Sequence, residues 1–150
     1  MKKKLELCLA TWFGVGNAPF APGTFGTLAA IPCVLFYNYF LSNFIFLFFT
    51  VTSLGFFVSG AAAKQLGSSD PSKIVIDEVA GFILGLCFIP FELKGVLLVF
   101  VFFRFFDIVK CWPMSSCEKL SGSLGIMMDD LAAGLLAGTL VHFFYQFGLL

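Results

Sequence analysis

The segment Gly122-Ser-Leu-Gly-Ile-Met-Met-Asp-Asp-Leu-Ala-Ala-Gly134 places two adjacent carboxylates, Asp129 and Asp130, directly before a long apolar run. Neighbouring acids at the mouth of an apolar segment repel one another and lose hydration unless a positive group lies between them. Carboxylate oxygens suit hard divalent cations such as Mg²⁺, so the pair is a candidate metal site. The alternative is a helix N-terminus, where the macrodipole favours acids in the first turn. The choice depends on where the other acids lie.

The chain as a whole is too apolar for an ordinary soluble domain. Of its 150 residues, 59% are hydrophobic, 12% are charged and 22 are phenylalanine, and the mean hydropathy is +0.98. This composition is typical of an integral membrane protein, and the length indicates one domain over residues 1–150. A formal net charge of zero argues against nucleic acid as a partner. Five cysteines without a CxxC pair predict neither a disulfide framework nor a zinc site.

Five apolar segments predict an all-α bundle of about five membrane-embedded helices. They are residues 28–41, 44–63, 79–91, 95–109 and 131–147. Only the second and the fifth approach the roughly 20 residues that a straight helix needs to cross a bilayer. The other three are expected to be short or re-entrant unless polar flanking residues join the helix. Two glycine pairs at four-residue spacing favour close packing between helices, namely Gly81 with Gly85 and Gly134 with Gly138.

Residues 11–27 are rich in Gly, Pro and Thr, and this composition predicts a loop. Its end, Gly23-Thr-Phe-Gly-Thr27, could present backbone N–H groups and the hydroxyls of Thr24 and Thr27 to a phosphate. The alternative is an entry turn in which Thr24 or Thr27 caps the following helix. The sequence leaves both open.

Basic residues orient the predicted helices. If the lysine-rich N-terminus lies in the cytoplasm, the positive-inside rule is satisfied, because the alternate loops then place there Lys64, Lys73, Lys110 and Lys119. The Gly23–Thr27 loop falls on the same side of the membrane. Five carboxylates from three predicted helix ends also gather on this side: Asp77, Glu78, Asp107, Asp129 and Asp130.

Two cations accompany these acids. Arg104, Asp107 and Lys110 are three residues apart, which puts them on one face of a helix. Two cations beside an acid suit a phosphoryl group better than an ion pore, so a lipid phosphate ester is the substrate class within reach. The alternative is a helix-end salt bridge, although an unpaired Arg104 inside a phenylalanine-rich run would be costly.

Other catalytic groups fit poorly. His142 is the single histidine of the chain, and we interpret it as a core residue far from the acids, which argues against histidine-based hydrolysis. The remaining acids are interpreted as solvated or capping residues: Glu6, Asp70, Glu92 and Glu118.

Four segments share the order and spacing of motifs in a known family: Gly14-Val-Gly-Asn-Ala-Pro-Phe-Ala-Pro-Gly-Thr-Phe-Gly-Thr-Leu28, Ile76-Asp-Glu-Val-Ala-Gly81, Phe103-Arg-Phe-Phe-Asp-Ile-Val-Lys-Cys-Trp-Pro113 and Gly125-Ile-Met-Met-Asp-Asp-Leu-Ala-Ala-Gly134. Together they resemble the phosphatidylglycerophosphatase A family, bacterial membrane enzymes that remove the terminal phosphate from phosphatidylglycerophosphate. The resemblance covers nearly the whole chain. It departs from the family at Cys111, where proline is common, a change that removes no charged group.

The resemblance implies a Mg²⁺-dependent phosphatase of the bacterial cytoplasmic (inner) membrane, with its active site facing the cytoplasm and no obligate protein partner. Its products would be phosphatidylglycerol and inorganic phosphate. Carried onto this chain, it implies these metal ligands: Asp77, Glu78, Asp129 and Asp130. The last two would also be catalytic, and Asp107 would be a further ligand or the general base. The phosphate would be held by Arg104, Lys110, Gly23, Thr24 and Thr27.

Three other functions compete with this one. A cation transporter or channel would distribute its acids across the depth of the bilayer. A lipid phosphotransferase of the CDP-alcohol type would carry an Asp-Gly and Ala-Arg pattern that residues 129–134 do not supply. A membrane scaffold gives no account of so many acids in so apolar a chain.

Overall fold

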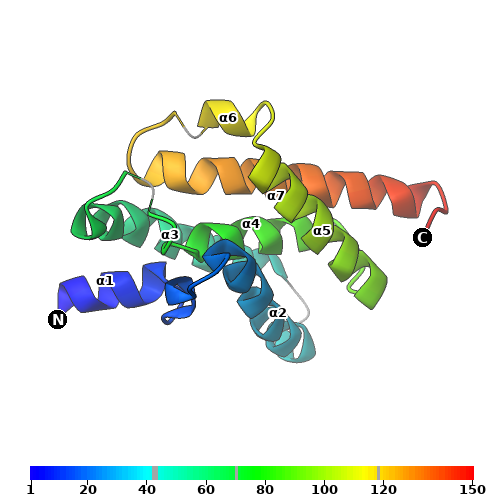
Figure 1. Cartoon of the computed structure of the whole chain (residues 1–150). Helices are drawn as coiled ribbons and strands as arrows, with labels where there is room; N and C mark the ends of the chain where they lie inside the picture. The colour runs from blue at the N-terminus through cyan, green and yellow to red at the C-terminus, as the bar shows by residue number, and fades with distance from the viewer. Residues whose placement is uncertain (42–43, 70, 118) are drawn as a thin grey trace.

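All secondary structure in the described part of the chain is helical. The computed structural model describes residues 1–41, 44–69, 71–117 and 119–150. Its elements (Figure 1) are α1 (Lys2–Ala10), the 3₁₀ turn η1 (Val15–Asn17), α2 (Pro22–Leu41), α3 (Phe44–Leu66), α4 (Ile76–Leu86), α5 (Leu93–Val109), α6 (Met114–Cys117) and α7 (Ser123–Gln146). The predicted all-α class is confirmed, because α2, α3, α4, α5 and α7 correspond to the five predicted apolar segments.

Two short helices were not predicted. α1 packs against α3, where Gln65 donates a hydrogen bond from Nε2 to the Glu6 carboxylate at 2.7 Å. Glu6 therefore ties two helices together rather than standing free in solvent. The four-residue α6 leads from the end of α5 to the start of α7.

α2 begins at Pro22, within the stretch that was predicted to be a loop. Proline suits the first turn of a helix, because its missing N–H would have no intrahelical partner there. Thr27 donates its hydroxyl to the Gly23 carbonyl at 2.9 Å, and a Cβ on Gly26 would lie only 2.7 Å from the Val75 Cβ. These glycines serve close helix packing rather than turns, so the loop prediction for residues 23–27 is wrong.

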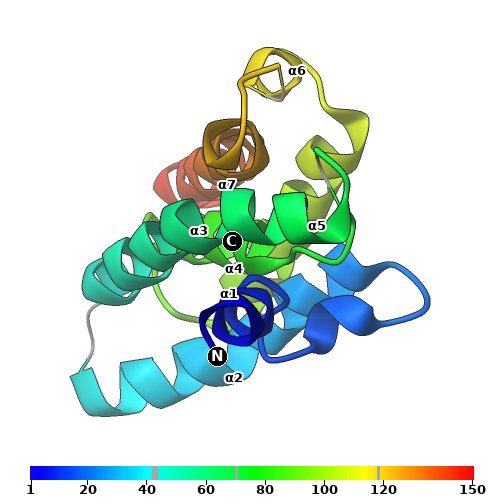
Figure 2. The ribbon, with the colours of Figure 1, turned by 90° about the vertical axis from the view of Figure 1, so that its left-hand side faces the viewer.

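α4 lies at the centre of the molecule, with α2, α3, α5 and α7 packed around it (Figure 2). Nine of its 11 residues are buried, as expected for a helix that is apolar on nearly every side. At about 1.5 Å per residue it is roughly 16 Å long, too short to cross a hydrocarbon layer of about 30 Å. The third predicted segment is thus a short helix inside the bundle.

Glycines join α4 to α7. A Cβ on Gly134 would overlap the Gly81 carbonyl oxygen, and a Cβ on Gly138 would approach the Gly85 Cα to 2.8 Å. The predicted close packing is therefore confirmed, and the two glycine pairs are partners of each other. Because Gly81 meets Gly134 and Gly85 meets Gly138, the helices are parallel and their N-terminal halves lie together.

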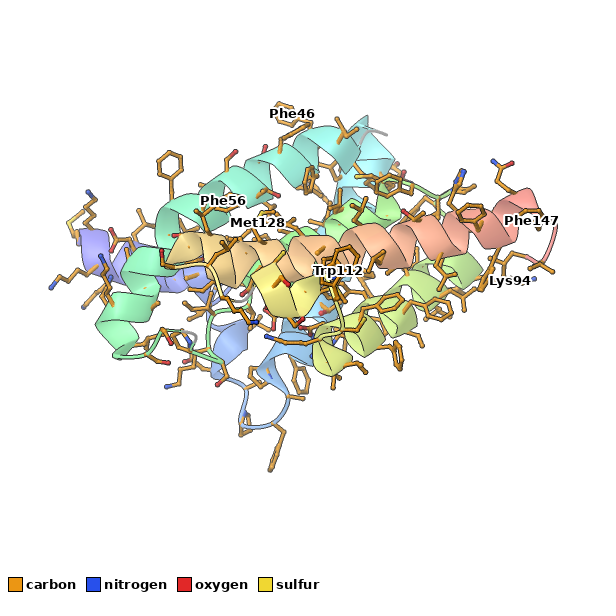
Figure 3. The ribbon with its side chains drawn as sticks, turned by 90° about the horizontal axis from the view of Figure 1, so that it is seen from above. Phe46, Phe56, Lys94, Trp112, Met128 and Phe147 are labelled. Carbon is orange, nitrogen blue, oxygen red and sulfur yellow. The ribbon has the colours of Figure 1, made fainter. Side chains whose placement is uncertain are left out.

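α5 runs in the opposite direction along α7. Figure 3 places Lys94, near the start of α5, at the same end of the molecule as Phe147, which directly follows α7. Since α5 also packs against α7, the last turn of α5 lies beside the beginning of α7. The beginning of α4, the end of α5 and the beginning of α7 therefore meet, although they are distant in the sequence.

Two described helices, Phe44–Leu66 and Ser123–Gln146, are long and apolar enough to cross a membrane, judged by length and composition. They correspond to the second and fifth predicted segments. Phe46 and Phe57 of α3 are 67% and 82% exposed, and Figure 3 shows Phe46 pointing away from the bundle. Such a helix surface is suited to lipid rather than to water.

Candidate active site

The first turn of α4 supplies two acids, Asp77 and Glu78. Asp77 Oδ1 accepts a hydrogen bond from the Glu78 N–H at 3.0 Å, and the residue is only 6% exposed. Burial, followed by the nearby Glu78 carboxylate, raises the pKa of Asp77 well above its usual value. A cation at this position would offset both effects.

Asp130 reaches the same place from α7. This helix begins at Ser123, so Asp129 and Asp130 lie in its second turn, and the alternative that they are first-turn acids is wrong. Carboxylate oxygens of Asp77, Glu78 and Asp130 lie within 4.8 Å of one another. We call these three residues the acid cluster.

The acid cluster fits a hard divalent cation. Within the described part of the chain, two of its buried oxygens have no hydrogen-bond partner, Glu78 Oε2 and Asp130 Oδ1. A buried carboxylate oxygen without a donor is costly, whereas Mg²⁺ binds such oxygens directly. Mg²⁺ commonly uses few carboxylates and fills its other positions with water and substrate phosphate, which suits a three-acid cluster.

An ion pair on α5 borders the acid cluster. Arg104 Nη1 lies 2.6 Å from Asp107 Oδ2, and the two side chains are 15% and 13% exposed. The predicted sharing of one helix face is confirmed for this pair. Both groups act electrostatically on Glu78, so a guanidinium and a fourth carboxylate stand beside the candidate metal ligands.

Lys110 leaves that face and contacts α7 instead. It directly follows α5 with a left-handed backbone (φ 47°, ψ 44°), and its Nζ lies 3.0 Å from Asp129 Oδ2. Its ion pair therefore joins the end of α5 to another helix, rather than closing α5 on itself. The five predicted acids thus divide into the acid cluster and two cation-paired carboxylates, Asp107 and Asp129.

α2 brings Gly23 to the acid cluster. A Cβ on Gly23 would overlap Glu78 Oε1 and would lie 3.1 Å from Arg104 Nη1, so the glycine lets the helix approach both groups. Thr24 follows it and is half-buried. Thr27 is fully buried, and its hydroxyl proton is already donated to the Gly23 carbonyl. Phosphate binding by these residues stays a prediction.

A sequence signal for the pairing of α4 with α7 was overlooked. Asp77, Gly81 and Gly85 are spaced by four residues, and so are Asp130, Gly134 and Gly138. Four-residue steps stay on one helix face, so each of these acids lies on the same face as its glycines. Asp129 is one residue out of this register, which distinguishes it from Asp130.

His142 and Glu92 do not belong to the acid cluster. His142 is half-buried, and its Nδ1 lies 2.8 Å from the Phe88 carbonyl oxygen. Because its side chain is only partly buried in the C-terminal part of α7, its interpretation as a core residue is wrong. Glu92 is exposed before α5, while Asp70 and Glu118 lie outside the described residues.

Several known proteins are similar in sequence to this chain. The family model for phosphatidylglycerophosphatase A matches residues 8–145. Phosphatidylglycerophosphatase A of Escherichia coli is 35% identical over 90% of this chain and 80% of its own length. The Haemophilus influenzae protein of the same name is 37% identical over 95% and 89%. A putative phosphatidylinositol-3-phosphatase of Bacteroides thetaiotaomicron is 37% identical over 91% of each chain. No solved structure gives a significant match.

Proposed function

Because the chain belongs to the phosphatidylglycerophosphatase A family, we propose that it hydrolyses phosphatidylglycerophosphate to phosphatidylglycerol and inorganic phosphate. The reaction is Mg²⁺-dependent and serves phospholipid biosynthesis. One observation carries the proposal beyond family membership: carboxylates from α4 and α7 meet within 4.8 Å beside the cations at the end of α5. The whole chain acts as a single phosphatase domain.

The acid cluster is the proposed metal site. Glu78 and Asp130 each have a buried oxygen without a hydrogen-bond partner among the described residues, and Asp77 completes the group from the same turn as Glu78. When bound there, Mg²⁺ would supply positive charge for the phosphoryl oxygens and would make water a stronger nucleophile at neutral pH.

Arg104 and Lys110 are the proposed phosphate-binding groups. As the phosphate ester is hydrolysed, negative charge on its oxygens is stabilised by fixed cations that need not reorganise. The Asp107 carboxylate orients the Arg104 guanidinium at 2.6 Å. We assign Asp107 the second task of accepting the proton from the attacking water, since it borders the acid cluster without belonging to the three-carboxylate group.

The proposed location is the bacterial cytoplasmic (inner) membrane, crossed more than once, with the acid cluster on the cytoplasmic side. Two helices have the length and composition to span, and the lysine distribution favours this orientation. The lipid substrate and the membrane are the expected partners; we infer no nucleic acid and no obligate protein partner.

The competing functions are less well supported. An ion pathway would distribute acids along the bilayer depth, whereas this chain brings three of them together within 4.8 Å. A second lipid substrate deserves a direct comparison, because one relative is named as a putative phosphatidylinositol-3-phosphatase. Both lipids present a phosphate monoester, so the acid cluster alone does not discriminate between them.

The test is phosphate release by the detergent-purified chain from phosphatidylglycerophosphate and, in parallel, from phosphatidylinositol 3-phosphate. We expect release from the first lipid with Mg²⁺, none with EDTA, and a loss of about a hundredfold or more in Asp130→Asn. Glu92→Gln, which removes an exposed acid at the other end of α5, is the control and should remain active. Preference for the inositol lipid would overturn the proposed substrate, and undiminished release in EDTA would overturn the metal.

A further inference from the structure

We propose that Asp129 is a positioning residue for Lys110 and not a ligand of the metal, an inference that rests on the proposed function. Both oxygens of Asp129 already have protein partners. Oδ2 lies 3.0 Å from Lys110 Nζ, and Oδ1 accepts the backbone N–H of Asp130 at 3.0 Å. Its neighbour differs, because Asp130 Oδ1 has no such partner among the described residues.

Helix geometry separates the two acids. Successive residues of an α-helix are rotated by about 100°, so adjacent side chains leave the axis in different directions. Asp130 shares the register of the glycines that face α4 and joins Asp77 and Glu78. Asp129 points instead to the end of α5, where Lys110 lies. Asp130 therefore faces the proposed metal site, whereas Asp129 contacts Lys110.

The ion pair fixes a side chain that is otherwise adaptable. Lysine carries a compact charge on a flexible four-carbon side chain, and this side chain loses much conformational entropy when it is held in one place. Asp129 is 9% exposed and Lys110 is 29% exposed at the side chain, so a buried anchor holds a partly accessible ammonium. An ammonium has three donors. The contact with Asp129 thus places the ammonium in one position, from which a phosphate can be bound.

The experiment separates positioning from metal binding with two readouts. Steady-state kinetics on phosphatidylglycerophosphate are measured for Asp129→Asn, Lys110→Met, the double variant and Asp129→Glu. Thermal unfolding in detergent is measured with Mg²⁺ alone and with Mg²⁺ plus inorganic phosphate, with Asp130→Asn as the comparison for loss of metal binding.

We expect Asp129→Asn and Lys110→Met each to raise KM about tenfold, the loss of one charge-assisted contact, with a smaller effect on kcat. The double variant should be no worse than either single variant, since both remove the same interaction. Asp129→Glu should recover part of the loss. The Mg²⁺-induced rise in unfolding temperature should persist in Asp129→Asn, whereas the further rise caused by phosphate should shrink.

Two results would overturn the proposal. Loss of the Mg²⁺ effect in Asp129→Asn, as in Asp130→Asn, would make Asp129 a ligand. If the loss of activity in the double variant equals the product of the losses in the two single variants, Asp129 and Lys110 act separately. Lys94→Met, at the far end of α5, is the matched lysine control and should behave as wild type. If the wild-type chain releases no phosphate from the lipid, the proposed substrate fails, and the phosphate and Mg²⁺ effects on unfolding still decide the role of Asp129.

Discussion

At Gly23 the absence of a side chain is what allows three helices to share one site. The space that a Cβ would fill holds Oε1 of Glu78, and Arg104 Nη1 lies close beside it. Gly23 stands in the first turn of α2, where its small size permits close approach rather than an unusual backbone angle. The glycine therefore sets the distance between α2 and the acid cluster.

We expect Gly23→Ala to lower phosphate release about a hundredfold, because displacement of catalytic groups by about 1 Å can cost this much. Helix propensity acts in the opposite direction, since Ala forms helices more readily than Gly, so the loss should arise at the site. The assay is phosphate release at saturating Mg²⁺. Leu28→Ala, at a 42% exposed position of the same helix, should stay active. A fully active Gly23→Ala chain would contradict this account.

At the scale of elements, the contact between α4 and α7 determines whether the acid cluster exists. Asp77 and Asp130 belong to separate helices, and each precedes the glycines through which those helices touch. Their mutual distance is therefore a consequence of the close packing of α4 on α7 through these glycines. A change that separates the helices should affect stability and metal binding together.

Gly134→Ala tests this coupling, since its Cβ would overlap the Gly81 carbonyl oxygen. Overpacking typically costs about 1–3 kcal/mol, and each kcal/mol lowers the unfolding temperature by about 2–4 °C in a chain of this size. We expect a lower unfolding temperature in detergent and a smaller rise on adding Mg²⁺. Leu135→Ala, at a 46% exposed neighbouring position, should retain both values. An unchanged Gly134→Ala chain would disprove the coupling.

At the scale of the whole molecule, the arrangement of helices gives the bundle two chemically different ends. The acids and their cations lie where α4 and α7 begin and α5 ends, while Lys94 and Phe147 lie at the other end (Figure 3). Between them, α3 presents exposed phenylalanines. In the proposed function, an amphiphilic lipid keeps its acyl chains beside the apolar helices and presents its phosphate at the end of the bundle that carries the acid cluster.

Cysteine labelling tests the orientation of these two ends in the membrane. Cys111 is exposed and directly follows Lys110. In a variant that retains only this cysteine, we expect a membrane-impermeant maleimide to react after lysis of spheroplasts but not before. Lys94→Cys, in a background without other cysteines, should react before lysis, because it lies at the opposite end. Labelling of Cys111 in intact spheroplasts would place the acid cluster outside and contradict the proposed topology.

The amino-acid sequence by itself determined the helical class, the approximate positions of the five main helices and the set of charged residues near the site. These follow from local chemistry, since long apolar runs form helices in a membrane and charges there are too costly to occur without a partner. Local composition gave a wrong loop prediction at residues 23–27, because glycine occurs both in loops and at close helix contacts. Only the packing of α2 on Val75 and Glu78 distinguishes the two.

Only the tertiary structure decided the partner of each charge. The glycine spacing of the sequence puts Asp130, and not Asp129, on the face of Gly134 and Gly138. Only the fold shows that Asp129 contacts Lys110 and that Asp130 joins Asp77 and Glu78. Lys110 was expected on the face of Arg104 and Asp107, but the left-handed backbone after α5 directs it to α7. Residue spacing specifies direction around one helix axis, whereas a contact depends on the relative placement of two helices, which the glycine packing between α4 and α7 provides.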